Sequence, residues 1–268
     1  MIIYKPVNKE NMYNYNSAYF KQAARMQLTG QWGSAALFTF VFNVISYAVN
    51  GLSSLFLDAM MYAVAFVIGV IAGLSGMDVE AISAADSSIF TLLVMLPMYP
   101  LIFLFSYVIY FLLSPLMYSF NVSFLDNKRS GVSLDPGRMF KGYKELMRIG
   151  GTTVLMYLYA ALWSLLLLIP GIVKYISYSQ TYYVMHDNPG LSYNKAIERS
   201  MAMMDGYKMR YFKLLLSFIG WFLLNLITCG ISTFWVTPYM QTAFAHFYEF
   251  VKEEYEKKTS AAEPAVNE

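Results

Sequence analysis

The two histidines are the residues of this chain with the widest chemical range, because an imidazole can move protons and bind metal ions. His186 is followed directly by Asp187, and His246 stands three residues before Glu249. Imidazole and carboxylate groups of this kind can bind Zn²⁺. The sequence favours a simpler interpretation, a polar residue ending a helix at a membrane surface, since it contains no zinc-protease, nucleophile-elbow, phosphate-loop or dinucleotide-binding motif. We therefore expect no catalytic residue, cofactor or metal ion, and a protein that is not an enzyme.

The stretch HDNPG, residues 186–190, is the most distinctive polar loop. Asn-Pro-Gly ends a helix and turns the chain into the next element, and this is the interpretation that we favour. The alternative is functional, because His186, Asp187 and Asn188 would stand at the cytoplasmic end of that helix. There they are candidates for contact with a ligand or a protein partner.

Polar residues also interrupt the long apolar stretches, and Asn43, Lys174, Gln180 and Asn225 are the candidates for intramembrane or ligand contacts. Intramembrane polarity is costly and often functional, so these residues could line a polar path, with Lys174 binding an anionic solute or lipid. The alternatives are hydrogen bonds between helices and, for Lys174, a side chain that extends to the outer headgroups.

Tyrosines gather at helical spacing shortly after Lys174. They are interpreted here as helix packing rather than as a cage for a cation. The group comprises Tyr175, Tyr178, Tyr182 and Tyr183.

The composition indicates the class of protein. Apolar residues make up 57% of the 268 positions and charged residues 13%, whereas soluble domains average about 25% charged. An apolar run of roughly 18 or more residues indicates a membrane span. The net charge of +2 argues against nucleic-acid binding, and the basic segments suit the anionic inner leaflet of a membrane. The long apolar stretches are 34–57, 59–76, 89–120, 152–187 and 214–248.

The distribution of positive charge predicts the topology. All but Lys174 of the 19 Lys and Arg residues fall in four segments, 1–33, 126–150, 187–213 and 250–268. Positive charge is retained on the cytoplasmic side of membranes. Four cytoplasmic segments require six transmembrane helices, with both termini in the cytoplasm. The expected fold is an all-α polytopic membrane protein.

This topology requires the two longest apolar stretches to turn outside the membrane. Pro170-Gly171 interrupts the first, and Cys229-Gly230 holds the equivalent place in the second, because proline lacks an N–H and glycine tolerates left-handed backbone. Residues 57–88 carry acidic residues and no Lys or Arg, so they are expected outside. Within them, 59–76 is interpreted as an outer-face helix or a re-entrant segment.

An internal repeat supports three hairpins, each preceded by a cytoplasmic amphipathic lead helix. FKGYK at 140–144 parallels MDGYK at 204–208, and YSQTYY at 178–183 parallels YMQTAF at 239–244. The expected segments are an N-terminal amphipathic segment (1–33), a first hairpin (34–125) with an extracytoplasmic insertion (58–88), a second lead helix and hairpin (126–187), a third lead helix and hairpin (188–250), and a partly disordered cytoplasmic tail (251–268).

The third lead helix is the clearest of these amphipathic segments. Ser192 is expected to cap it and Gly206 to end it. A basic amphipathic helix of this kind can lie on the inner leaflet. Segment 128–148 has a similar pattern, broken at Asp135-Pro136-Gly137. The apolar face of the third lead helix would consist of Ala196, Ile197, Ser200, Met203 and Met204.

From Trp163 through IPGIVKY, SYSQTYYV, DNPGLSYNKAI and LSFIGWFLL to WVTPY and FYE, the chain resembles a bacterial membrane family catalogued as domain of unknown function 975. The resemblance covers 150–250 well and 20–57 and 89–150 loosely, and it departs at 58–88. It implies a multi-pass protein of the bacterial plasma (inner) membrane. It brings no activity and no functional residues.

Two functions of different class follow from these features. The first is a non-enzymatic membrane protein that acts in assembly, envelope homeostasis or regulation through its cytoplasmic face, with the lipid bilayer, anionic inner-leaflet lipids and proteins as partners. The alternative is a small-solute or lipid transporter or channel built from repeated hairpins, because transporters also use repeats and broken helices.

Overall fold

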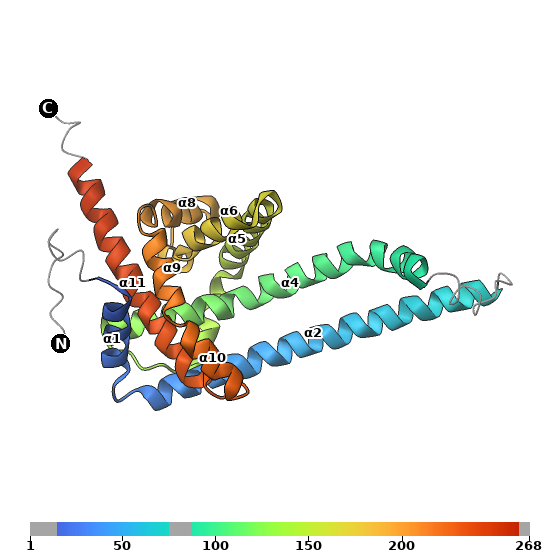
Figure 1. Ribbon diagram of the computed structural model, residues 1–268, viewed down its shortest axis with the longest axis horizontal. Coiled ribbons are helices and arrows are strands. Elements are labelled where there is room, and N and C mark those ends of the chain that lie inside the picture. The colour runs from blue at the N-terminus through green and yellow to red at the C-terminus, as the bar shows by residue number, and fades with distance from the viewer. Residues whose placement is uncertain (1–14, 75–86, 263–268) are drawn as a thin grey trace. The chain divides into compact units, whose positions relative to one another are not determined.

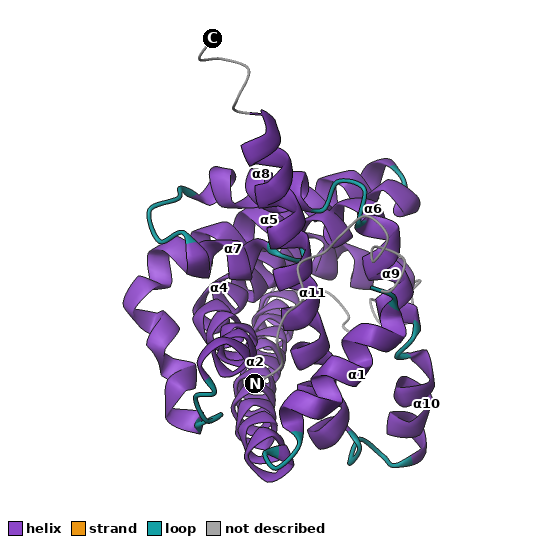
Figure 2. Ribbon diagram, turned by 90° about the vertical axis from the view of Figure 1, so that its left-hand side faces the viewer, coloured by secondary structure: helices purple, strands orange, loops and turns teal. Residues whose placement is uncertain are grey.

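The computed structural model describes residues 15–74 and 87–262, and every element in this part of the chain is helical (Figure 1, Figure 2). The expected all-α class is therefore confirmed. The elements are α1 (Ser17–Leu28), α2 (Trp32–Leu74), α4 (Ser87–Ser130), the 3₁₀-helix η2 (Pro136–Glu145), α5 (Leu146–Leu166), α6 (Leu168–Tyr178), α7 (Thr181–Asp187), α8 (Tyr193–Met203), α9 (Lys208–Leu216), α10 (Ile219–Ile227) and α11 (Thr233–Ala262).

Three helical stretches in the described residues are long and apolar enough to cross a membrane, namely Trp32–Val67, Pro100–Ser130 and Lys208–Ile227. Large apolar side chains along them are exposed, among them Leu52 on α2 and Leu226 on α10. Exposing so much apolar surface to water is unfavourable, whereas lipid tails accommodate it. The chain therefore has the features of a membrane-associated protein.

The chain divides into two compact units, of which the smaller comprises residues 43–113. In this unit α2 and α4 lie side by side (Figure 1), and the ring of Phe56 stacks on that of Phe105 at 4.9 Å between centroids. Residues 59–74 of the segment expected to be an outer-face helix or a re-entrant segment do not form a separate element, because α2 continues without a break to Leu74. No proline occurs between residues 57 and 74 to interrupt it. Residues 75–86 of the predicted insertion lie outside the described residues.

The larger unit contains the hairpin of α5 and α6, and its turn differs from the expected one. The chain turns at Leu167, which has extended backbone, while Pro170 and Gly171 lie in the first turn of α6. A proline is tolerated there because the first N–H groups of a helix have no partner within it. Gly171 is needed for close packing instead, since a Cβ at this position would lie 2.9 Å from the Cα of Ser164.

The turn expected between α10 and α11 is confirmed. Cys229 and Gly230 both have positive φ, 49° and 89°. The amide of Gly230 donates to the carbonyl of Asn225 at 2.9 Å. This pattern closes a helix C-terminus through left-handed residues.

Helix α11 packs against α8 and, along much of its length, against α1. Asn16 caps α1 through its side chain, which accepts from the amide of Tyr19 at 3.0 Å. The buried ring of Phe20 then meets Phe247 and Phe250 of α11, with centroids 5.4 and 5.8 Å apart. Aromatic pairs at these spacings contribute beyond their burial. The buried face of α1, in the described part of the N-terminal segment, thus packs on α11.

Helix α8 has the predicted apolar face, but this face packs against other helices and not against the expected lipid surface. Ala196, Ile197, Ser200, Met203 and Met204 are all buried, and the helix packs against α5, α6, α7 and α11. The hydroxyl of Ser200 donates to the carbonyl of Ser177 on α6 at 2.8 Å. The apolar face of this lead helix therefore belongs to the protein core instead of lying on lipid. Ser192 occupies the N-cap position without a side-chain capping bond, and Gly206 has the expected positive φ of 80°.

The close approach at Gly171 gives a first prediction. Gly171→Ala should destabilise the protein by about 1–3 kcal/mol, because the added methyl group collides with the backbone of α5. The measurement is the thermal unfolding midpoint of the protein in lipid nanodiscs. Gly33→Ala on α2 is the control, because a Cβ there meets no atom within 4 Å. An equal midpoint for the two variants would contradict the tight hairpin turn.

Candidate functional site

The predicted HDNPG segment ends α7 and places Asp187 at the centre of a cluster of charged residues. Arg129 of α4 donates through Nη1 and Nη2 to the two carboxylate oxygens of Asp187, at 2.5 and 2.9 Å. Tyr248 and Lys252 of α11 each donate to Oδ2 at 2.7 Å. The side chain of Asp187 is only 8% exposed. One carboxylate therefore joins three helices, α4, α7 and α11.

The neighbouring residues complete this arrangement. Arg129 also donates through Nε to Glu249 at 2.6 Å, so both sides of its guanidinium are paired. Asn188 ends α7 by donating to the carbonyl of Val184 at 2.9 Å, and its carbonyl oxygen accepts from Arg199 of α8 at 3.2 Å. The favoured interpretation of HDNPG as a helix end and turn is confirmed, and the same residues organise the polar cluster.

The pKa of the Asp187 carboxyl reflects two opposing effects. Burial by itself would raise the pKa, but the hydrogen bonds from Arg129, Lys252 and Tyr248 outweigh burial and hold it well below its ordinary value of 3.8. A lowered folded-state pKa means that the unfolded chain binds the proton more readily. Asp187 therefore stabilises the fold above that ordinary value, and the contribution is lost as the pH falls below it.

His186 faces a different part of the cluster. Its Nε2 lies 3.0 Å from Oδ1 of Asp126, whose Oδ2 accepts from Arg138 at 3.3 Å. With the proton on Nε2, its Nδ1 faces the hydroxyl of Tyr118 at 3.5 Å. A hollow of about 160 Å³ opens here, and Lys141 and Glu145 also line it. Side chains of both charges thus surround a surface hollow beside the predicted loop.

The metal site considered for the two histidines gains no support. Among residues 15–74 and 87–262, no group of three or more His, Cys, Asp or Glu side chains stands close enough to hold a metal ion. His186 is engaged with Asp126. Nε2 of His246, on α11, is buried without a hydrogen-bond partner in the described part of the chain.

The four candidates within the apolar stretches lie at separate places in the fold, and three of them make local contacts. Lys174 stands over the ring of Trp163 at 4.7 Å, near the tip of the α5–α6 hairpin. The Nε2 of Gln180 donates to the hydroxyl of neighbouring Ser179 at 2.8 Å. Oδ1 of Asn225 accepts from the hydroxyls of Ser232 and Thr233 at 3.0 and 2.7 Å, which fixes the α10–α11 turn.

Asn43 is the fourth of these candidates. It is half-buried on α2, with Nδ2 lacking a hydrogen-bond partner among the described residues. It belongs to the smaller unit, whereas Lys174, Gln180 and Asn225 belong to the larger one. Lys174 contacts an aromatic ring, and Gln180 and Asn225 make local hydrogen bonds, so the contacts within the described residues do not join these three side chains into a polar path.

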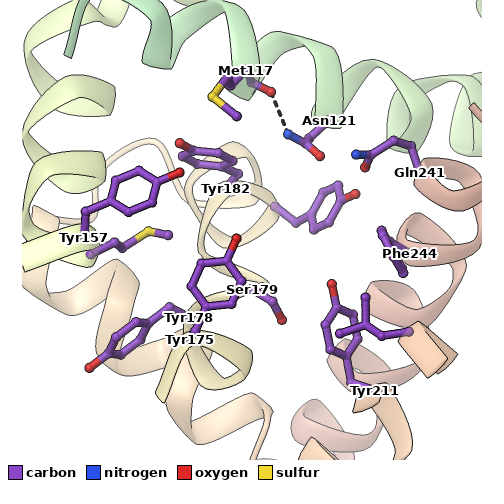
Figure 3. Close-up of a pocket in the computed structure, with 13 residues that line it drawn as sticks. Met117, Asn121, Tyr157, Tyr175, Tyr178, Ser179, Tyr182, Tyr211, Gln241 and Phe244 are labelled. Carbon is purple, nitrogen blue, oxygen red and sulfur yellow. Dashed lines mark hydrogen bonds between the residues drawn. The ribbon is translucent and has the colours of Figure 1, made fainter. Parts of the chain in front are cut away.

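A second site lies inside the larger unit. Six tyrosines, drawn from α5, α6, α7 and α9, line a cavity of about 280 Å³ (Figure 3). Helices α4 and α11 complete the wall. Tyr175 is 58% exposed, so one side of the cavity reaches the surface. The residues lining it are Met117, Asn121, Met156, Tyr157, Tyr175, Tyr178, Ser179, Tyr182, Tyr183, Tyr211, Leu215, Gln241 and Phe244.

Sequence reasoning found only parts of these two sites. The spacing of the tyrosines at 175–183 predicts a helical cluster, yet Tyr157 and Tyr211 join it from distant positions in the chain. The charge pattern places Arg129 and Lys252 only in basic segments. The sequence signal for the cluster is the acid Asp187 directly after His186 at the end of an apolar stretch, because a carboxylate taken out of water requires cationic partners.

Comparison with known proteins identifies a family. A family model described as a protein of unknown function (DUF975) matches residues 12–255. No curated protein and no solved structure matches the chain.

The Asp187 cluster gives a second prediction. Asp187→Asn should lower the free energy of unfolding at pH 7 by about 2 kcal/mol, because two partly exposed cations lose their buried partner. The difference from the wild type should shrink as the pH falls below 3.8, where the wild-type carboxylate begins to lose its own advantage. Chemical unfolding in nanodiscs at several pH values measures both effects.

A matched control separates this cluster from ordinary surface charge. Lys257 pairs with Glu253 and Glu254 on the exposed side of α11, so Lys257→Gln should change stability by at most about 0.5 kcal/mol. A cost for Asp187→Asn no larger than that of Lys257→Gln would show that the cluster does not hold the helices together.

Proposed function

The chain belongs to the DUF975 family of proteins of unknown function, and we propose that it is a non-enzymatic protein of the bacterial inner membrane that acts in assembly, envelope homeostasis or regulation. Its working surface is the cytoplasmic face around His186, Asp187 and Asn188, and its partners there are proteins and anionic inner-leaflet lipids.

The observation that carries this proposal is the charged hollow beside His186. Asp126, Arg138, Lys141 and Glu145 line it together with the histidine, so it presents both charges to a partner. Complementary charges at an interface favour specific association. The Asp187 cluster joins α4, α7 and α11 next to this hollow. Helices that are already held in place lose less conformational entropy when a partner binds.

The proposed topology has six transmembrane helices in three hairpins, with both termini in the cytoplasm. Its support is the position of basic residues, which gather at the Asp187 end of the larger unit in Arg129, Arg138 and Lys252. The tips of the α5–α6 and α10–α11 hairpins instead expose apolar residues such as Leu165 and Leu226. The positive-inside rule then places the basic end of the unit in the cytoplasm and the apolar hairpin tips in the membrane or on its outer side.

The second candidate function is transport of a small solute or lipid, and the tyrosine-lined cavity favours it. Transporters hold their substrates between helices, at positions where helices are broken. This cavity lies next to the break between α6 and α7, where Ser179 forms part of its wall. The first function remains our conclusion because three hairpins would be an unusual transporter architecture.

The topology is tested with the single cysteine. Cys229 is exposed at the α10–α11 turn, so a membrane-impermeant maleimide added to intact cells should label it. Cysteine placed at Lys141 in a Cys229→Ser background should be labelled only after the cells are opened. Labelling of Lys141→Cys in intact cells would reverse the proposed orientation.

The cytoplasmic working surface is tested by photo-crosslinking in cells. A photoreactive amino acid at Lys141, which lines the hollow, should give a defined crosslinked species that disappears when Arg138→Ala removes one charge of the hollow. The same amino acid at Leu226, on a hairpin tip, serves as the control and should give no such species. Solute uptake by proteoliposomes of the purified protein, with no crosslink from Lys141, would replace this function with transport.

A further inference from the structure

We propose that the tyrosine-lined cavity is a binding site for a small organic ammonium ion, in which the charge lies among tyrosine rings and an N–H group donates to Gln241. This site does not depend on the proposed action of the cytoplasmic face, and binding is distinct from transport of the bound ion.

The shape and walls of the cavity indicate a ligand of modest size. Its volume of about 280 Å³ is close to the roughly 300 Å³ at which small-molecule pockets begin. The rings of Tyr157, Tyr178, Tyr182 and Tyr211 stand around one open space (Figure 3). Tyr178 is buried whereas Tyr175 is exposed, so the cavity has a closed interior and a side open to entry.

The charge of the ligand follows from the lining. None of the 13 described side chains around the cavity is charged. Tyrosine rings present electron-rich faces, which attract a cation and repel an anion. Several rings can compensate a single positive charge without a carboxylate, as in aromatic sites for ammonium groups. A neutral apolar molecule would also be buried in the cavity, but the electron-rich ring faces would not attract it as they attract a cation.

Two unsatisfied polar atoms indicate that the ligand carries hydrogen-bonding groups. The hydroxyl of Tyr183, a residue only 3% exposed, and Oε1 of Gln241 are buried and have no hydrogen-bond partner among the described residues. Leaving such atoms unpaired costs free energy. Gln241 lies on the α11 side of the cavity (Figure 3). A rotation of its amide group turns the buried Oε1 toward the open space, where it can accept from an ammonium N–H.

The remaining lining fits the hydrocarbon part of such a ligand. Met117, Met156 and Leu215 supply flexible apolar contacts, and Phe244 adds a further ring. Two tyrosine hydroxyls are already engaged, since that of Tyr182 pairs with Thr153 at 2.9 Å and that of Tyr211 with Ser179. The engaged hydroxyls hold their rings in place, which preserves the open space for a ligand.

Calorimetric titration of the full chain in lipid nanodiscs tests the site, with heats from protein-free nanodiscs subtracted. The probes are benzylammonium, benzyltrimethylammonium and benzyl alcohol, which share one ring and differ in charge and N–H groups. We expect both cations to bind at least about tenfold more tightly than benzyl alcohol, from the attraction of the rings for positive charge. This comparison uses wild-type protein alone, so it does not depend on any variant folding.

Variants then locate the binding. Tyr182→Leu should weaken benzylammonium binding by about tenfold, while Tyr182→Phe keeps the ring and most of the affinity. Gln241→Leu should weaken benzylammonium, which donates hydrogen bonds, more than benzyltrimethylammonium, which cannot. Tyr62→Leu, at a tyrosine that is 76% exposed on α2, is the control and should change nothing.

Three results would overturn the proposal. The first is equal or tighter binding of benzyl alcohol, which would make the cavity a site for neutral molecules. The second is the absence of measurable binding by either cation. The third is a loss of affinity in Tyr62→Leu equal to that in Tyr182→Leu, which would place the cations on the lipid-facing surface.

Discussion

The larger unit depends on one buried carboxylate. Asp187 ends α7, and three donors from α4 and α11 occupy its two oxygens. Apolar contacts tolerate small shifts between helices, but a two-pronged Arg–carboxylate pair has one good geometry. The cluster thus fixes the relative positions of α4, α7 and α11 where packing of membrane helices alone would allow several. The same requirement explains why the HDNPG segment is both a turn and a polar centre.

Helix α11 runs from the apolar α10–α11 turn to the ion cluster around Asp187. Toward its C-terminus it supplies Lys252 to the carboxylate, and its aromatic residues, such as Phe247 and Phe250, pack on α1. At its N-terminal end Thr233 donates to Asn225 in the exposed turn. One helix, with Pro238 in its interior, therefore contributes side chains both to the ion cluster and to the hairpin tip. The apolar surface around that tip suits lipid, and the charged end suits water.

The sequence predicted the helices and turns more accurately than it predicted which helices and side chains contact one another. Apolar runs and the Cys229-Gly230 pair predicted helices and a turn correctly, because they depend on local backbone chemistry. Pro170 was wrongly taken as the turn, since proline is tolerated in the first turn of a helix as well as in loops. The face of α8 was identified from its period, but nothing local distinguishes a face against lipid from one against protein. The partners of Asp187 depend on contacts 58 to 65 residues apart in the chain, which periodicity cannot supply.

The two sites of the larger unit are connected by a pair of stacked aromatic rings, one from each site. Tyr183 lines the cavity, and its ring stacks on that of Tyr248 with centroids 5.0 Å apart. The hydroxyl of Tyr248 donates to Asp187. A displacement of Tyr183 must therefore move Tyr248 or break the stack, and a movement of Tyr248 alters the donors around the carboxylate. The stack of Tyr183 on Tyr248 is therefore the contact that joins the cavity wall to the hydrogen-bond donors of Asp187. This contact gives the interior of the helical unit a direct physical route to its charged face.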